Sequence, residues 1–196
     1  MKGRIQAIIV LGILSWALAS PGVAAEAQKF QYDPPKIARP LFDKNLTMLD
    51  RERGEYATNL ATYAANLVAG QNASKESLAK ARRLLALAMH LDPRNRKALV
   101  VDFQLQKGVL PEKSKTTYTA GALARLLFAR GELLKREADP QNKLLARAFV
   151  ELASEMDPHN EDAVYACALQ RRELGTFDWT QITDTPAPKP PPDQTS

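Results

Sequence analysis

Apolar residues recur every three or four positions through most of the chain, which is the spacing of one face of an α-helix. This spacing begins near Leu46 and continues to Gly175. Residues that start and end helices divide it into about six segments. The sequence therefore predicts an all-α fold over residues 46–175.

The first three predicted helices lie between Leu46 and Gly108. The first ends at Gly70, the second follows the predicted N-cap Ser74, and the third follows the predicted N-cap Asn95. The apolar residues of the first helix are Leu46, Leu49, Tyr56, Leu60, Tyr63 and Leu67. The apolar residues of the third helix are Leu99, Val100 and Phe103.

Three more helices are predicted after a loop over residues 108–118. The fourth runs from about Thr119 to Glu137, with apolar residues Leu123, Leu126, Leu127, Leu133 and Leu134. Asp139 and Pro140 start the fifth, because proline is accepted in the first turn of a helix. Asn160 caps the sixth, in which Glu161 and Asp162 lie favourably at the positive end of the helix dipole.

An internal repeat relates the two halves of this region. The Asp-Pro-x-Asn turns at 92–95 and 157–160 are 65 residues apart. The same shift aligns Ala81, Arg82, Leu85, Ala88 and Ser74 with Ala146, Arg147, Val150, Ala153 and Asp139. We therefore predict two three-helix blocks, roughly 46–107 and 119–174, which bury their core by stacking.

The helices before the two turns resemble the second helix of a tetratricopeptide repeat. The family's pattern is a small residue, then a large apolar one, then an alanine, then a proline, at fixed spacing. Two stretches match it: Ala81, Leu85, Ala88 and Pro93, and Ala146, Val150, Ala153 and Pro158. The resemblance implies antiparallel helical hairpins stacked as a short solenoid, with a groove that holds a partner peptide or helix. It assigns no binding residues, because the first helices depart from the family's pattern.

The first 25 residues are typical of a signal peptide. Lys2 and Arg4 precede an apolar stretch over 5–19, and Val23-Ala24-Ala25 ends in small residues before Glu26. The stretch is shorter than the roughly 20 residues of a membrane span, so cleavage is favoured over a retained anchor. The mature protein is expected in the periplasm or outside a bacterial cell.

The segments on either side of the helical region are rich in proline. Residues 26–45 contain Pro34, Pro35 and Pro40 and are predicted to be an extended lead-in. Residues 176–196 are predicted to be a flexible tail, which is either a spacer or a ligand for a proline-binding groove.

The net charge of the chain is small, and only local clusters of basic residues suggest a binding role. Removal of the signal peptide leaves 25 basic and 22 acidic residues, a net charge of +3. This is too small to favour nucleic acid, and aromatic residues are not interleaved with the basic clusters. Arg82, Arg83, Arg96 and Lys97 are either solvated charges or contacts to an anionic partner.

A short aromatic sequence follows the last predicted helix. Phe177 and Trp179 either pack on the end of the helical region or form an exposed docking element. They complete the set of possible partner contacts.

The remaining polar residues do not form a recognisable catalytic or metal site. His90 and His159 lie outside any zinc-binding spacing, and the pair Glu151 and Glu155 is interpreted as an exposed helix face. Cys167, the single cysteine, is expected to pack as a small apolar residue. We therefore expect no enzymatic activity and no cofactor.

The favoured function is an exported, tetratricopeptide-like module that binds another protein and acts as a scaffold of the cell envelope. The alternative is a non-enzymatic binder of an anionic envelope polymer or lipid headgroup through the basic clusters. The identity of the partner and the oligomeric state stay open.

Overall fold

The computed structural model describes residues 30–70 and 73–185. The predicted signal peptide, residues 1–25, and residues 186–196 of the proline-rich end lie outside these ranges. The elements in the described ranges are β1 (Lys36–Ile37), α1 (Asp50–Val68), α2 (Lys75–Leu91), α3 (Arg96–Gln106), α4 (Ala120–Leu134), α5 (Pro140–Met156), α6 (Glu161–Leu174), α7 (Thr180–Thr183) and β2 (Asp184–Thr185). The all-α prediction is confirmed.

Side chains cap most of the helices where the sequence places them. The Ser74 hydroxyl accepts a hydrogen bond from the backbone N–H of Ser77, whose own hydroxyl accepts one from the N–H of Ser74. Asn95, Asp139 and Asn160 likewise accept bonds from backbone N–H groups in the first turns of α3, α5 and α6. These bonds satisfy donors that a helix leaves free at its start.

The start of the first helix differs from the prediction. α1 begins at Asp50, not at Leu46. Leu46 is buried in the turn before the helix, whereas Leu49 at its N-cap is 76% exposed. The apolar spacing extends past the helix because residues of the preceding turn also pack on the core.

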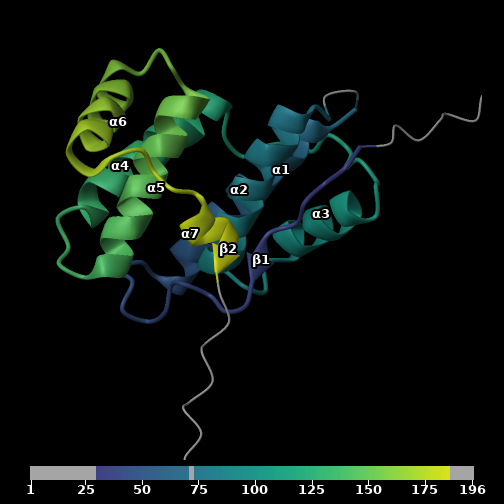
Figure 1. The fold of residues 1–196 in the computed structure, drawn as a ribbon, viewed down its shortest axis with the longest axis horizontal. Coiled ribbons are helices and arrows are strands. Elements are labelled where there is room, and N and C mark those ends of the chain that lie inside the picture. The colour runs from purple at the N-terminus through teal and green to yellow at the C-terminus, as the bar shows by residue number, and fades with distance from the viewer. Residues whose placement is uncertain (1–29, 71–72, 186–196) are drawn as a thin grey trace, which may run out of the picture.

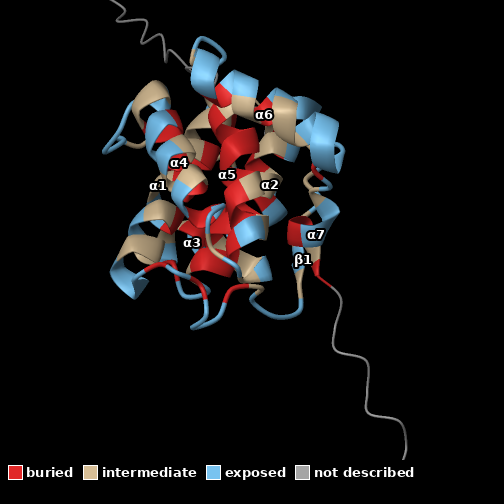
Figure 2. Ribbon diagram, turned by 90° about the vertical axis from the view of Figure 1, so that its left-hand side faces the viewer, coloured by how far each residue is buried: buried red, intermediate tan, exposed pale blue. Residues whose placement is uncertain are grey.

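The two hairpins α1–α2 and α4–α5 lie next to each other and form the centre of the molecule (Figure 1). α3 packs on α1 and α2, and α6 packs on α5. Figure 2 shows α1 and α4 at one side, α7 and β1 at the other, and α2 and α5 between them. Buried residues run along α5 and the inner sides of its neighbours.

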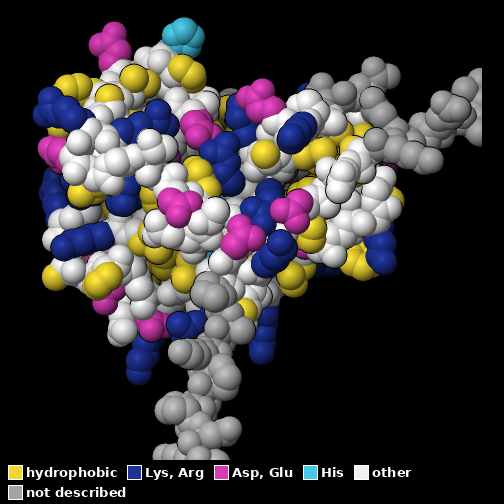
Figure 3. All heavy atoms as spheres, in the orientation of Figure 1, with side chains coloured by type: hydrophobic (Ala, Val, Ile, Leu, Met, Phe, Trp, Pro, Cys, Tyr) yellow, Lys and Arg dark blue, Asp and Glu magenta, His cyan; other side chains and the backbone are white. Residues whose placement is uncertain are grey.

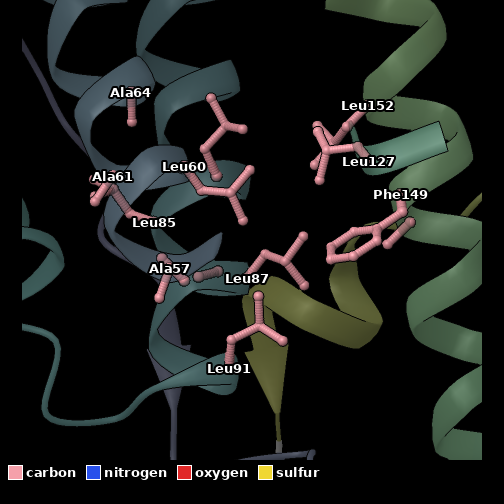
Figure 4. Packing of buried hydrophobic residues seen from close by; sticks show 14 of the residues in the cluster. Ala57, Leu60, Ala61, Ala64, Leu85, Leu87, Leu91, Leu127, Phe149 and Leu152 are labelled. Carbon is pink, nitrogen blue, oxygen red and sulfur yellow. The ribbon is translucent and has the colours of Figure 1, made fainter. Parts of the chain in front are cut away.

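The core lies between the two hairpins. Leu60 and Leu87 on one side face Leu127, Phe149 and Leu152 on the other (Figure 4). Each fully buried side chain of this size contributes about 1.5–3 kcal/mol. Small residues let the paired helices approach closely, and the alanines that do so in α1 and α2 are Ala57, Ala61, Ala64, Ala81 and Ala88, all fully buried.

Polar contacts also connect the hairpins. Arg130 of α4 forms an ion pair with Glu52 of α1 at 2.7 Å, and the Tyr56 ring of α1 packs on Phe149 of α5 with centroids 5.2 Å apart. Side-chain contacts therefore join α1 to both α4 and α5 across the interface between the hairpins.

The segment after α6 is ordered, which corrects the prediction of a flexible tail from residue 176. Residues 176–185, here called the C-terminal strap, cross α5 and reach α2 (Figure 1). Phe177 and Ile182 of the strap are buried in the core. Its last residues form β2, which pairs in parallel with β1, so that Lys36 lies beside Asp184. The strap therefore closes over the joint between the hairpins.

Candidate protein-binding surface on α3

The six predicted contact residues separate into two groups. One group lies at the C-terminal strap: Phe177 and Trp179 belong to the strap, and Arg82 and Arg83 of α2 contact it. The other group is Arg96 and Lys97, which lie together in the first turn of α3. The structure therefore does not bring the six residues into one site.

Arg82 makes internal contacts to both ends of the described chain. Its Nη2 donates to Asp184 Oδ1 at 2.8 Å and to the Pro34 carbonyl at 3.5 Å, and lies 3.5 Å from Asp33 Oδ2. The bond from Arg82 is the main cause that lowers the pKa of Asp184. The charge of Arg82 is therefore matched within the protein, and its contact with a partner stays a prediction.

Phe177 and Trp179 of the strap pack together with Arg83 of α2. The Arg83 guanidinium lies 5.1 Å from the centre of the Trp179 ring and also pairs with Glu155 at 3.1 Å. Phe177 is buried and meets Trp179 edge to face at 4.9 Å. Figure 3 shows acidic and basic side chains next to each other where α7 and the strands lie. Phe177 and Trp179 therefore pack on the helices, the first of the two alternatives predicted for them, and Arg83 holds them there.

The outer side of α3 is apolar and exposed. Leu99, Val100 and Phe103, here called the α3 face, are 46%, 46% and 60% exposed. The buried side of α3 consists instead of Ala98, Val101, Asp102 and Leu105. The residues that mark this helix in the sequence therefore point to solvent. Because they are spaced one, three and four positions apart, they form one continuous patch.

A hollow of about 370 Å³ borders the α3 face where α3 meets α1. Thr58 of α1 and Arg96 and Val100 of α3 line it. The loop after α3 is held beside α1, where the Asn66 side chain bonds to both the N–H and the carbonyl of Ser114. The Ser114 hydroxyl accepts a bond from Lys97 at 2.8 Å. Arg96 is therefore the exposed one of the two predicted cations, and Lys97 is partly used within the fold.

The surroundings of the α3 face are basic. Residues 94–115 contain six basic and two acidic side chains, a net charge of +4. One of the acids, Asp102, is buried and accepts hydrogen bonds from Tyr32 and Gln106. The positive charge that faces solvent therefore exceeds the net charge of the segment.

Basic residues in the first turn of α3 oppose the helix dipole. The N-terminus of a helix carries a partial positive charge that favours acidic side chains there. α6 follows this rule with Glu161 and Asp162, which align with Arg96 and Lys97 at the 65-residue shift. The two cations of α3 thus oppose the dipole of their own helix; the bond from Lys97 to Ser114 gives Lys97 a role in the fold, whereas Arg96 is exposed.

Glu151, Glu155 and Cys167 make contacts inside the fold. Glu151, predicted to be exposed, is buried, and its Oε2 accepts a bond from Arg171 at 2.6 Å, while Glu155 pairs with Arg83. This corrects the interpretation for Glu151 alone, because Glu155 is exposed as predicted. Cys167 is buried beside Glu151, and burial raises the pKa of its thiol. Residues 30–70 and 73–185 contain no group of three metal-binding side chains.

Comparison of the chain with protein-family models, with curated proteins and with solved structures finds no match in any of the three. Within the described ranges, the helices are too short or too polar to cross a membrane.

Proposed function

We propose that this chain is an exported, non-enzymatic, tetratricopeptide-like interaction module of the cell envelope, and that the α3 face binds a partner protein. The partner supplies an amphipathic helix whose apolar side covers Leu99, Val100 and Phe103. Acidic residues on the flanks of that helix meet the cations around α3. The location rests on the signal peptide predicted from residues 1–25.

The observation that carries the proposal is the position of cations at both ends of the exposed apolar patch. Arg96 lies one helical turn before Val100, and Lys107 lies one turn after Phe103, with its Nζ 5.4 Å from the ring centre. An apolar stripe between two cations matches an amphipathic helix with acidic flanks, because burial supplies affinity and charge sets orientation and register.

The cost of Arg96 to its own helix gives a second argument. Charges that oppose a helix dipole are worth about 0.3–1 kcal/mol in stability. The aligned position in α6 holds Glu161, so this fold accommodates the stabilising residue. A basic residue at the start of α3 therefore lowers helix stability where an acidic one would raise it, and contact with an acidic partner would offset that cost.

An anionic polymer or a lipid headgroup would use the same cations but would not require the apolar residues between them. Such ligands are held mainly by charge, so their binding falls steeply with salt. The exposed phenylalanine and leucine favour a protein partner, whose contact also removes apolar surface from water.

The test is site-specific photo-crosslinking in intact cells of the source bacterium. A photoreactive amino acid at Phe103 is compared with one at Tyr165, which is 71% exposed on α6 but lies near Glu161 and Asp162. We expect one protein adduct from position 103 and none of that size from position 165. The variant Arg96→Glu should reduce this adduct at least tenfold while raising the free energy of unfolding by about 0.3–1 kcal/mol.

The stability measurement separates loss of binding from loss of folding. Adducts of equal amount from both positions, or an adduct that persists in Arg96→Glu, would overturn the assignment of the α3 face. Absence of any protein adduct, together with salt-sensitive binding to anionic vesicles or envelope polymer, would replace the protein partner by the alternative ligand.

A further inference from the structure

A second groove lies between α5 and α6, on the other hairpin. It has a volume of about 210 Å³, with Ala146 and Val150 of α5 at its floor and Leu174 of α6 at its wall. Lys143 and Arg147 of α5 stand beside these apolar residues. The volume is below the roughly 300 Å³ of typical small-molecule pockets, and suits a single side chain with its backbone.

Along the corresponding helices of the first hairpin lies a segment of the chain itself, with a hollow of about 720 Å³ beside it. At the 65-residue shift, Ala146, Arg147 and Val150 align with Ala81, Arg82 and Leu85 of α2. Residues 30–34 run in extended form along α2 and α3 (Figure 1). The α2–α3 groove is thus occupied by a peptide segment, and the α5–α6 groove is open.

The bound segment shows which chemistry the α2–α3 groove accepts. Phe30 and Tyr32 are partly buried against the core, and the Tyr32 hydroxyl donates to Asp102 of α3 at 2.8 Å. Asp33 lies 3.5 Å from Arg82, which also donates to the Pro34 carbonyl. The occupant therefore combines aromatic side chains with an adjacent carboxylate that lies near the arginine of the helix, which also pairs more closely with Asp184 of the strap.

Arg147 has no such carboxylate in the described part of the chain. Its Nη2 donates to the Gly175 carbonyl at 3.2 Å, and its guanidinium lies 5.4 Å from the Phe177 ring centre, so it is held in place without being neutralised. Lys143 is exposed beside it and forms no ion pair within residues 30–70 and 73–185. Three cations line the groove, the third being Lys135, against one acid, Glu173.

We infer that the α5–α6 groove binds an extended segment of a partner protein that carries an aromatic side chain next to an acidic one. The aromatic ring covers Ala146, Val150 and Leu174. The carboxylate pairs with Arg147 and Lys143, as Asp33 pairs with Arg82 in the α2–α3 groove. This site is separate from the α3 face and does not depend on the function proposed for it.

The test uses the chain's own lead-in as a probe. A fluorescent peptide with the sequence of residues 29–36 is titrated with the mature protein, 26–196, and binding is followed by anisotropy. The control peptide replaces Asp33 by lysine and both aromatic residues by alanine. We expect saturable binding of the first peptide and none of the second, and methyl NMR signals of Val150 and Leu174 that shift while those of Val100 do not.

Two charge reversals at exposed lysines provide matched protein controls. Lys143→Glu should weaken binding at least tenfold, because it places a carboxylate beside the acidic side chain of the peptide. Lys115→Glu changes the net charge equally but lies in the loop after α3, and should leave binding within twofold. The variant Phe103→Ser should also leave it unchanged, which separates this groove from the α3 face.

No saturable binding, or equal weakening by both charge reversals, would overturn the inference. The inference would also be overturned if the unmodified protein self-associates and Lys143→Glu abolishes this self-association. The groove would then hold the lead-in of a second copy.

Discussion

The Nε2–H of His90 donates a hydrogen bond of 2.8 Å to the backbone carbonyl of Ile182, which attaches the C-terminal strap to α2. The other ring nitrogen, Nδ1, accepts a bond from the backbone N–H of Leu41 in the lead-in. The two bonds together require the neutral ring with its proton on Nε2. One imidazole therefore connects the segments that precede and follow the helical region.

Protonation of His90 should loosen this connection. Burial lowers the pKa of His90 from its ordinary value of 6.5, and the Phe42 ring lies 6.1 Å away. The unfolded chain therefore takes up a proton at higher pH than the folded protein does, and stability falls as the pH drops below about 6.5. The free energy of unfolding in urea should be lower at pH 5.5 than at pH 7.5.

A pair of histidine variants assigns this dependence to its source. His90→Gln, which does not titrate, should lose most of the difference between the two pH values, whereas His159→Gln should retain it. An unchanged difference in His90→Gln would contradict this role of the ring.

Removal of the buried strap residue should cost far more than removal of the end that follows it. Ile182 is fully buried, and Ile182→Ala is expected to reduce the free energy of unfolding by about 2–5 kcal/mol, from lost burial and the cavity left behind. A chain that stops after Thr185 should unfold with the same midpoint as the full mature protein. Thermal unfolding followed by circular dichroism checks both changes. An unchanged unfolding midpoint in Ile182→Ala would mean that this residue of the strap contributes no packing energy.

The buried ion pair of α5 and α6 should respond unequally to loss of its two partners. Glu151 is buried and Arg171 is partly exposed. Arg171→Ala leaves an unpaired carboxylate in the core and should destabilise the protein by roughly 3 kcal/mol. Glu151→Gln removes the buried charge and keeps its shape, so it should cost less. Urea unfolding of both variants measures the two losses of stability. A larger loss for Glu151→Gln than for Arg171→Ala would contradict the prediction.

Helix starts could be predicted because they depend on local contacts. Asn95, Asp139 and Asn160 each bond to an N–H group two or three residues further along the chain. A side chain of this kind next to an apolar run identifies such a start without knowledge of the fold.

The exposed side of α3 could not be predicted from spacing alone. Ala98, Val101 and Leu105 form one apolar stripe and Leu99 and Phe103 form another. Periodicity predicts a helix but does not say which stripe its neighbours cover. The available signal was the basic Arg96 at the position where the aligned helix has the acidic Glu161. The helix dipole favours an acidic residue there.

The burial of Glu151 depends on a residue 20 positions away. A glutamate four positions before another is ordinarily a solvated helix face. Only the packing of α6 on α5 brings Arg171 against it. The order of the strap could not be predicted for a similar reason. Ile182 contacts His90 of α2, which is 92 positions away, and the residues that follow the strap are rich in proline.

The parallel pairing of β1 with β2 sets the order in which the chain can assemble. Each helical hairpin joins neighbours in sequence and closes early, whereas Lys36 and Asp184 meet only after almost the entire chain has been made. The lead-in has no partner strand, and His90 has no carbonyl acceptor, until the strap arrives. A ribosome-bound chain from which residues 176–185 have not yet emerged therefore remains open at this edge.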